Sequence, residues 1–303
     1  MSAEGILQCL DLQNGRRIWH CDTTARFNVQ PNMYGVGSTP VVFEDLILVV
    51  VGGYDGESAA GVAAFDKRTG SLRYTLSETS ASYASIQTGA INGKPKAFAF
   101  MREGLIAFDP VNGKQLAFQP WAAKVSGCVN AATPVLHEDQ VFVSEAYGPG
   151  STLVRLVPDG FQTVWRDPLR SRERVFRAHW ATPILHEGHL YGCSGRHSSE
   201  GTFVCVNWKT GQRVWQYLQR SLSSVCFVDG YLINLSEDGT INLIEATPQE
   251  YREVARFKPT ITGVHAKPGD ELLLNYPVWA SPIVARDLLV VRGKHRIAPF
   301  DLN

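Results

Sequence analysis

The chain has 303 residues, 44% hydrophobic and 19% charged, and its 29 Lys and Arg residues balance 29 Asp and Glu residues. Zero net charge excludes the basic face that DNA or RNA binding requires, so we expect no nucleic-acid partner. The longest apolar run, residues 46–51, is far shorter than the roughly 20 residues that span a bilayer, so no transmembrane segment is predicted.

Two elements recur along the chain. The first is an apolar strand, a turn that begins with Asp or a related residue and ends with Gly, and a second strand that carries an aromatic residue. Because Asp caps backbone amides and Gly accepts a positive φ, this pattern predicts a tight hairpin. The turn glycines are Gly15, Gly70, Gly113, Gly160 and Gly211, and the aromatic residues that follow them are Trp19, Tyr74, Phe118, Trp165 and Trp215. These rings are large enough that we expect them to pack between neighbouring sheets.

The second recurring element is Ser or Thr followed by Pro and two branched apolar residues. It occurs at Pro40, Pro134, Pro183 and Pro282, and Thr88 and Ser224 occupy the two slots where the proline is missing. The turn glycines are 55, 43, 47 and 51 residues apart. A period of about 48 residues that contains only short strands is typical of a propeller with one four-stranded sheet per repeat.

The sequence therefore predicts an all-β fold, a single β-propeller domain of four-stranded antiparallel blades over residues 1–303. About six to seven blades are present. The expected repeats cover 5–22 (partial), 38–76, 85–119, 131–166, 180–217, 223–258 and 279–303 (partial). We expect essentially no helix, and only residues 170–177 are a candidate for a short turn of one.

The phase of the repeats is compatible with an incomplete ring that has an open edge beside Leu10, and a resemblance to eight-bladed propellers favours this arrangement, an incomplete eight-bladed ring. The chain opens with the third and fourth strands of a repeat, at 6–11 and 17–21, and closes after a third strand. The alternative is a six-bladed ring in which 17–21 supplies the missing fourth strand, since propellers normally close by such a pairing.

With these motifs, the chain resembles the PQQ-like (quinoprotein alcohol dehydrogenase-like) β-propeller repeat family, and within it the bacterial proteins similar to the outer-membrane-protein assembly factor BamB. The phrases that carry this likeness are YGVGSTP at 34–40, NAATP at 130–134 and EDGT at 237–240. Some members of the family are dehydrogenases that hold PQQ with calcium, and others are scaffolds for partner proteins.

The dehydrogenases sandwich PQQ between a tryptophan and a disulfide of adjacent cysteines, and this sequence has no adjacent cysteines. The expected function is therefore a non-catalytic binding or scaffold module of the bacterial cell envelope with a protein partner and no cofactor. The alternative is a quinoprotein-type oxidoreductase with a degenerate site for PQQ and calcium. The resemblance implies a periplasmic or envelope location, although no signal peptide is visible at the first residues.

The resemblance also implies that loops around the propeller axis line any binding site. The candidates for ligand or partner binding on these loops are Tyr34, Tyr83, Asn130, Tyr147, His179, Trp180, Arg196, His197, Glu237 and Trp279. No catalytic residue and no metal ligand is predicted.

Three other features have simpler explanations. His186 and His189 lie in a turn rather than on a helix, which favours an exposed polar turn over a metal site. The arginines Arg170, Arg172, Arg174 and Arg177 indicate either a solvated loop or a site for an anion or partner. We interpret the six cysteines as free thiols, although Cys193 and Cys205 could face each other across a hairpin.

Overall fold

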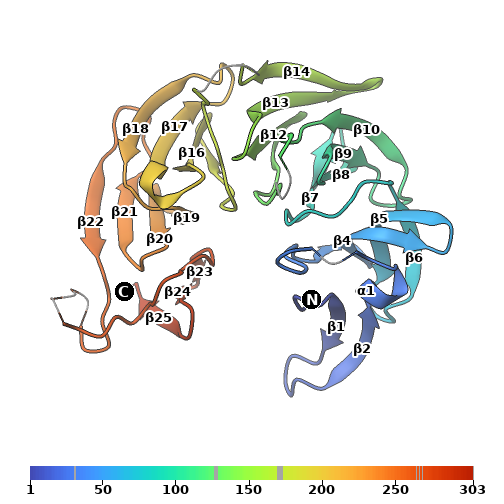
Figure 1. The fold of residues 1–303 in the computed structure, drawn as a ribbon, viewed down its shortest axis with the longest axis horizontal. Helices are drawn as coiled ribbons and strands as arrows, with labels where there is room; N and C mark the ends of the chain where they lie inside the picture. The colour runs from blue at the N-terminus through green and yellow to red at the C-terminus, as the bar shows by residue number, and fades with distance from the viewer. Residues whose placement is uncertain are drawn as a thin grey trace. The chain divides into compact units, whose positions relative to one another are not determined.

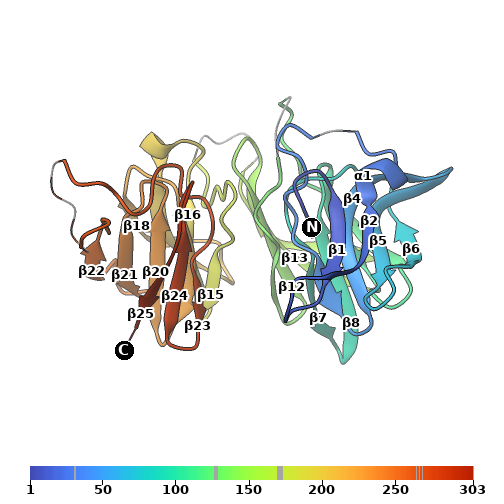
Figure 2. The same cartoon turned by 90° about the horizontal axis from the view of Figure 1, so that it is seen from below.

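The computed structural model describes residues 1–30, 32–125, 129–168, 173–263, 265, 267 and 269–302. The predicted all-β fold with four-stranded antiparallel sheets is confirmed (Figures 1 and 2). The chain divides into two compact units, Met1–Arg170 and Ser171–Asn303. That the whole chain forms one propeller domain, as an incomplete eight-bladed ring, stays a prediction.

The described residues of the first unit form one two-stranded sheet and three four-stranded sheets, and each of these four-stranded sheets joins consecutive strands of the chain. Its strands are β1 (Ile6–Leu10) and β2 (Arg17–Asp22); β3 (Val41–Phe43), β4 (Leu46–Asp55), β5 (Ser58–Asp66) and β6 (Leu72–Leu76); β7 (Gln87–Ile91), β8 (Lys94–Phe100), β9 (Gly104–Phe108) and β10 (Gln115–Pro120); β11 (Val135–His137), β12 (Gln140–Glu145), β13 (Gly150–Val157) and β14 (Gly160–Arg166).

In the second unit, the part of the chain that the structure describes forms two four-stranded sheets and one three-stranded sheet. Its strands are β15 (Ile184–His186), β16 (His189–Ser194), β17 (Thr202–Asn207) and β18 (Arg213–Leu218); β19 (Ser223–Val228), β20 (Tyr231–Ser236), β21 (Ile241–Glu245) and β22 (Glu253–Phe257); β23 (Ile283–Ala285), β24 (Leu288–Arg292) and β25 (Ile297–Asp301). Pro183 and Pro282 immediately precede the first strands of two of these sheets, where a missing N–H costs no ladder hydrogen bond.

The repeated turn closes as its residues predict. In the turn between β5 and β6, Asp66 Oδ1 accepts hydrogen bonds from the amides of Arg68 and Thr69, and the Gly70 amide donates to the Asp66 carbonyl at 2.9 Å. Gly70 has a φ of 72°, which a residue with a Cβ rarely adopts. The turn is thus specified locally by Asp and Gly.

The aromatic residues Trp19, Tyr74 and Trp215, which follow three of the turns, join their sheet to the next one in the same unit, whereas Phe118 is 41% exposed. In the first unit, Trp19 Nε1 donates to the Lys67 carbonyl at 3.1 Å, and the Tyr74 hydroxyl donates to the Pro110 carbonyl. In the second unit, Trp215 Nε1 donates to the Thr247 carbonyl at 3.0 Å. Each of these three side chains is at least partly buried and satisfies its polar atom on the turn of the following sheet.

Apolar side chains fill the space between neighbouring sheets within each unit. Middle strands such as β9 and β17 are buried on both faces, which explains why their sequences are apolar without alternation. In the second unit, the β15–β18 sheet lies beside the β19–β22 sheet (Figure 1). Tyr191, Phe203 and Cys205 of the first sheet pack against Val225 and Leu232 of the second.

The expectation of essentially no helix needs a small correction. Thr23–Arg26 forms one helical turn, α1, because the Asp22 side chain caps it by accepting from the Ala25 amide. Ser198–Glu200 forms a 3-10 turn, η1. The segment expected as the one helical candidate is not helical at 173–177, and its residues 170–172 lie outside the described residues.

Two sheets have fewer than four strands. In the described part of the chain, β1 pairs only with β2, so the backbone of Leu10 lies at a sheet edge. At the other terminus, β25 pairs only with β24 among the described strands, and Pro299 lies at its middle. Proline lacks a backbone donor, so it weakens further pairing at such an edge.

Candidate functional site

Five loops of the second unit meet at one end of its strands. Because consecutive strands are antiparallel, the loops that precede β15 and β23 lie at the same end as those that follow β16, β18 and β20 (Figure 2). We call this surface the loop end; its described residues are 173–183, 195–201, 219–222, 237–240, 258–263, 265, 267 and 269–282. It carries six of the ten residues proposed from the sequence: His179, Trp180, Arg196, His197, Glu237 and Trp279.

The structure brings four of these six residues into one cluster. The Trp180 ring lies 5.2 Å from the His179 ring and 5.6 Å from the Trp279 ring, centroid to centroid. Trp180 Nε1 donates to Ser224 Oγ at 3.3 Å, and Trp279 Nε1 donates to Glu237 Oε2 at 3.4 Å. Trp279 is nevertheless 51% exposed, so the cluster presents a fixed indole to the solvent.

Glu237 is the buried carboxylate of this cluster, and it accepts the hydrogen bond of Trp279. Its side chain is only 4% exposed, and Oε1 accepts from the Leu222 amide at 3.1 Å. The Glu237 amide donates to the Leu222 carbonyl, and the Glu237 carbonyl accepts from the Val278 amide, each at 2.9 Å. This residue therefore links the 219–222 and 258–282 loops and positions Trp279.

The surroundings of His179 disfavour its charged form. Burial lowers the pKa of His179 below its ordinary value of 6.5, and the positive charges of Arg196 and His197 lower it further, whereas the Glu237 carboxylate opposes the shift. Arg196 and His197 are both exposed. His179 is thus held neutral under a positively charged rim.

A pH dependence of stability follows from this depressed pKa. Unfolded His179 binds a proton near pH 6.5, whereas the folded protein binds it only at lower pH. Its contribution to stability is therefore complete above pH 6.5 and is lost as the pH falls from there through the folded pKa. We expect the urea midpoint to fall between about pH 7.5 and about pH 5.5, and to fall less in His179→Gln. Equal losses in the two proteins would contradict this assignment.

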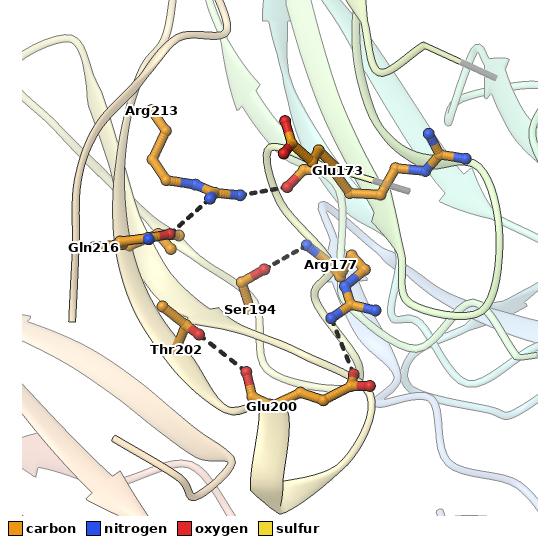
Figure 3. A pocket seen from close by; sticks show the side chains of 9 residues that line it. Glu173, Arg177, Ser194, Glu200, Thr202, Arg213 and Gln216 are labelled. Atoms are coloured by element: carbon orange, nitrogen blue, oxygen red, sulfur yellow. Dashed lines mark hydrogen bonds and ion pairs between the residues drawn. The ribbon is translucent and has the colours of Figure 1, made fainter. Parts of the chain in front are cut away.

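A polar pocket of about 350 Å³ adjoins the loop end (Figure 3). Arg213 clamps the 173–177 segment to the sheet by donating to the carbonyls of Arg174 and Val175, and its Nη1 donates to Gln216 Oε1 at 2.7 Å. Arg177 pairs with Glu200 at 2.9 Å, and the Arg177 amide donates to Ser194 Oγ at 2.9 Å. The pocket thus contains hydroxyl, amide and guanidinium hydrogen-bond donors, and the Glu200 carboxylate partly neutralises the charge of its arginines.

The sequence pointed to only part of this pocket. The arginine-rich segment indicated a site for an anion or partner, and Arg174 and Arg177 do line the pocket, while Arg170 and Arg172 lie outside the described residues. Ser194, Thr202 and Gln216 were not proposed. They come from three different strands, and no local motif marks side chains that meet only across a sheet.

The candidates in the first unit occupy different roles. Tyr34 is 69% exposed, packs on Tyr83 with ring centroids 5.9 Å apart, and donates its amide to the Tyr83 hydroxyl at 3.1 Å. Asn130 is 2% exposed, and its side chain donates to the Met101 carbonyl at 2.6 Å. Asn130 is therefore enclosed among backbone groups, whereas Tyr34 faces the solvent.

Tyr147 lies on the loop between β12 and β13. Its amide donates to Glu145 Oε1 at 2.9 Å, and the neighbouring Gly148 amide donates to Glu145 Oε2 at 2.7 Å. Glu145 is 1% exposed, so a buried carboxylate shapes this loop. Tyr147 and Asn130 belong to loops of the first unit, as the sequence placed them.

The histidine turn and the cysteines have structural roles. His186 and His189 pair across the turn between β15 and β16, and the His186 ring packs on Phe227 at 4.4 Å. The described cysteines are free, as expected, and Cys128 lies outside the described residues. Cys193 and Cys205 are not directly opposite, because they pair with Phe203 and Tyr191. Burial raises the pKa of each thiol to about 11.

Comparison with known proteins identifies the family. The family model described as outer membrane protein assembly factor BamB matches residues 1–217. The chain belongs to this family. None of the curated proteins matches this BamB-family chain.

Solved structures share the fold of this BamB-family chain. BamB from Moraxella catarrhalis matches with a TM-score of 0.64 and 13% identity over 98% of this chain and 76% of that chain. Sqt1 from Saccharomyces cerevisiae matches with a TM-score of 0.64 and 11% identity over 99% of this chain and 80% of that chain.

An enzyme of the quinoprotein class matches as well. Quinohemoprotein alcohol dehydrogenase from Comamonas testosteroni has a TM-score of 0.58 and 13% identity, over 85% of this chain and 51% of that chain. The BamB-family chain thus spans about half the length of that enzyme. At these identities the likeness shows the fold alone.

Proposed function

We propose that this chain is a non-catalytic binding module of the bacterial cell envelope, which uses the loop end of its second unit to hold a protein partner. The observation that carries this proposal is the exposed Trp279 indole, which packs at a tilt against Trp180 and hydrogen-bonds to the buried Glu237. Tryptophan and arginine are enriched among residues that dominate protein interfaces, and an indole already fixed in place loses little entropy on binding.

The family supports the envelope and partner parts of this proposal. The matching description is that of an outer membrane protein assembly factor, which implies work on other proteins at the envelope. In the described part of the chain, no helix is long and apolar enough to cross a membrane.

Truncating Trp279 tests this function. We expect Trp279→Ala to weaken capture of an envelope partner about thirtyfold, the effect of losing about 2 kcal/mol at an interface hot spot. The measurement is quantitative capture by the full tagged chain from detergent-solubilised envelope of its own bacterial host. Leu288→Ala is the matched control, because Leu288 is 43% exposed at the start of β24, at the opposite end of the strands. Equal capture by the Trp279 variant, or no captured protein, would refute the proposal.

The residues of the cluster do not fit the PQQ and calcium site of the quinoproteins. No two cysteines are adjacent in the sequence. The carboxylate beside the tryptophans, Glu237, already uses both oxygens to accept from Leu222 and Trp279. Trp180 packs against both His179 and Trp279. We therefore propose no bound cofactor and derive no redox step.

A melting experiment separates the binding module from the alternative oxidoreductase. A ligand that binds only the native state raises the melting temperature by mass action. We expect the full chain to have the same melting temperature with saturating PQQ and calcium as with calcium alone. A reproducible rise with PQQ would favour the oxidoreductase.

A further inference from the structure

Positive charge is concentrated around the second unit's first sheet. Residues 173–220 contain six Lys and Arg residues but three Glu and no Asp, in a chain whose overall charge is zero. Arg177, Arg196 and Arg220 lie on the loop end, where the acidic residues nearest to them in the chain are Glu173, Glu200 and Glu237, respectively. Glu237 is buried, and Glu200 pairs with Arg177. Arg196 and Arg220 are exposed, so this positive rim faces the solvent.

Backbone hydrogen bonds join the loops that carry the three arginines to the segment that carries His179 and Trp180. Arg177 lies on the same segment as His179 and Trp180, and the Gly195 amide, next to Arg196, donates to the Arg177 carbonyl at 2.9 Å. The Arg220 amide donates to the Gly201 carbonyl at 2.9 Å, which ties the third arginine to the same loops. A single extended peptide segment bound across the loop end would therefore contact the arginines and the tryptophans.

The pocket supplies hydrogen-bond donors beside this rim. Ser194 Oγ accepts from the Arg177 amide, which leaves the Ser194 O–H to donate to a ligand. Gln216 Oε1 accepts from Arg213, so the amide nitrogen of Gln216 is the group left for a ligand. The Arg177–Glu200 pair is partly exposed, at 32% and 42% of the two side chains, so an incoming carboxylate competes with Glu200 for the guanidinium.

We propose that the partner segment held at the loop end is an acidic peptide with apolar side chains. This inference rests on the proposed function and names the chemistry of the partner. The apolar side chains pack on Trp180 and Trp279, and the carboxylates pair with Arg177, Arg196 and Arg220. Charge complementarity supplies specificity and a salt-dependent association rate, and the indole supplies the buried contact.

The probe for this inference is a fluorescein-labelled hexapeptide with two central leucines flanked on each side by two glutamates. A second peptide replaces every glutamate with lysine. Binding to the full chain is measured by fluorescence anisotropy at about 20 mM and about 300 mM salt, where screening separates charge pairing from apolar contact. We expect the acidic peptide to bind, salt to weaken it, and the lysine peptide to bind at least tenfold more weakly.

Charge-neutral variants locate the site. We expect the triple variant R177Q/R196Q/R220Q to lose at least tenfold in affinity for the acidic peptide. The double variant R196Q/R220Q should lose less. Because it keeps the Arg177–Glu200 ion pair, a loss of affinity in this variant cannot be attributed to the loss of that pair from the fold. The variant K209Q/R252Q/R286Q removes as much charge from turns at the opposite end and should bind normally. Absent binding, equal binding of the lysine peptide, or unchanged affinity in the triple variant would overturn the inference.

Failure of this inference is distinguishable from failure of the proposed function. If envelope capture depends on Trp279 while the acidic peptide fails, the partner's chemistry is wrong and the binding module stands. If capture does not depend on Trp279, the proposed function itself fails.

Discussion

Replacing Phe203 with alanine is expected to lower the free energy of unfolding by about 3–5 kcal/mol, a large share of the 5–15 kcal/mol that stabilises a typical domain. Phe203 is fully buried in β17 and packs between Trp215 and Tyr251, with ring centroids 6.2 Å and 6.5 Å away. Truncation removes apolar contacts to both and leaves a cavity that neighbouring strands cannot close. Urea denaturation followed by tryptophan fluorescence measures the loss.

The matched control for this substitution is Phe203→Leu. It keeps most of the side-chain volume and should cost about 1 kcal/mol. If the alanine variant also cost less than about 1 kcal/mol, the contacts between the two sheets would not be what stabilises this unit.

Replacing Glu237 with alanine should destabilise the protein by about 2–3 kcal/mol and also weaken partner capture. The variant leaves the buried Leu222 amide without its carboxylate acceptor and frees Trp279 from Oε2. Glu237→Gln keeps an oxygen for Leu222 but turns an N–H toward the Trp279 N–H, so we expect an intermediate loss of stability. Urea denaturation and envelope capture are measured on the same preparations.

Glu237 is a positioning residue. Comparing partner capture by the wild-type and variant proteins when both are equally folded separates this role from an effect on stability. Capture by Glu237→Ala should be weaker even at a temperature where the variant is fully folded, because Trp279 is no longer held. Normal capture under that condition would show that the indole needs no fixing by Glu237.

The repeat architecture was predictable because its determinants are local. The Asp66 to Gly70 turn needs only a side chain that accepts backbone amides and a glycine at positive φ, both visible in five consecutive residues. The role of Trp19 as a link between sheets was predictable from its spacing after such a turn, and its hydrogen bond to Lys67 confirms it.

The candidate site was predictable only in part. Loop position alone selected both Trp279, which is exposed, and Asn130, which is enclosed by backbone carbonyls, so sequence did not separate a surface residue from a structural one. Ser224, which accepts from Trp180, was noted only as a strand position that lacks its proline.

By itself, the sequence determined the class of fold, the turns, the aromatic links between sheets and the absence of an overall charge, because each depends on residue type and spacing along the chain. The tertiary structure alone decided which loop residues meet. The contact of Trp180 with Trp279 joins residues almost a hundred positions apart, and the pocket joins side chains from three strands. Such contacts depend on strand register and on how neighbouring sheets pack, and no local pattern encodes either of these.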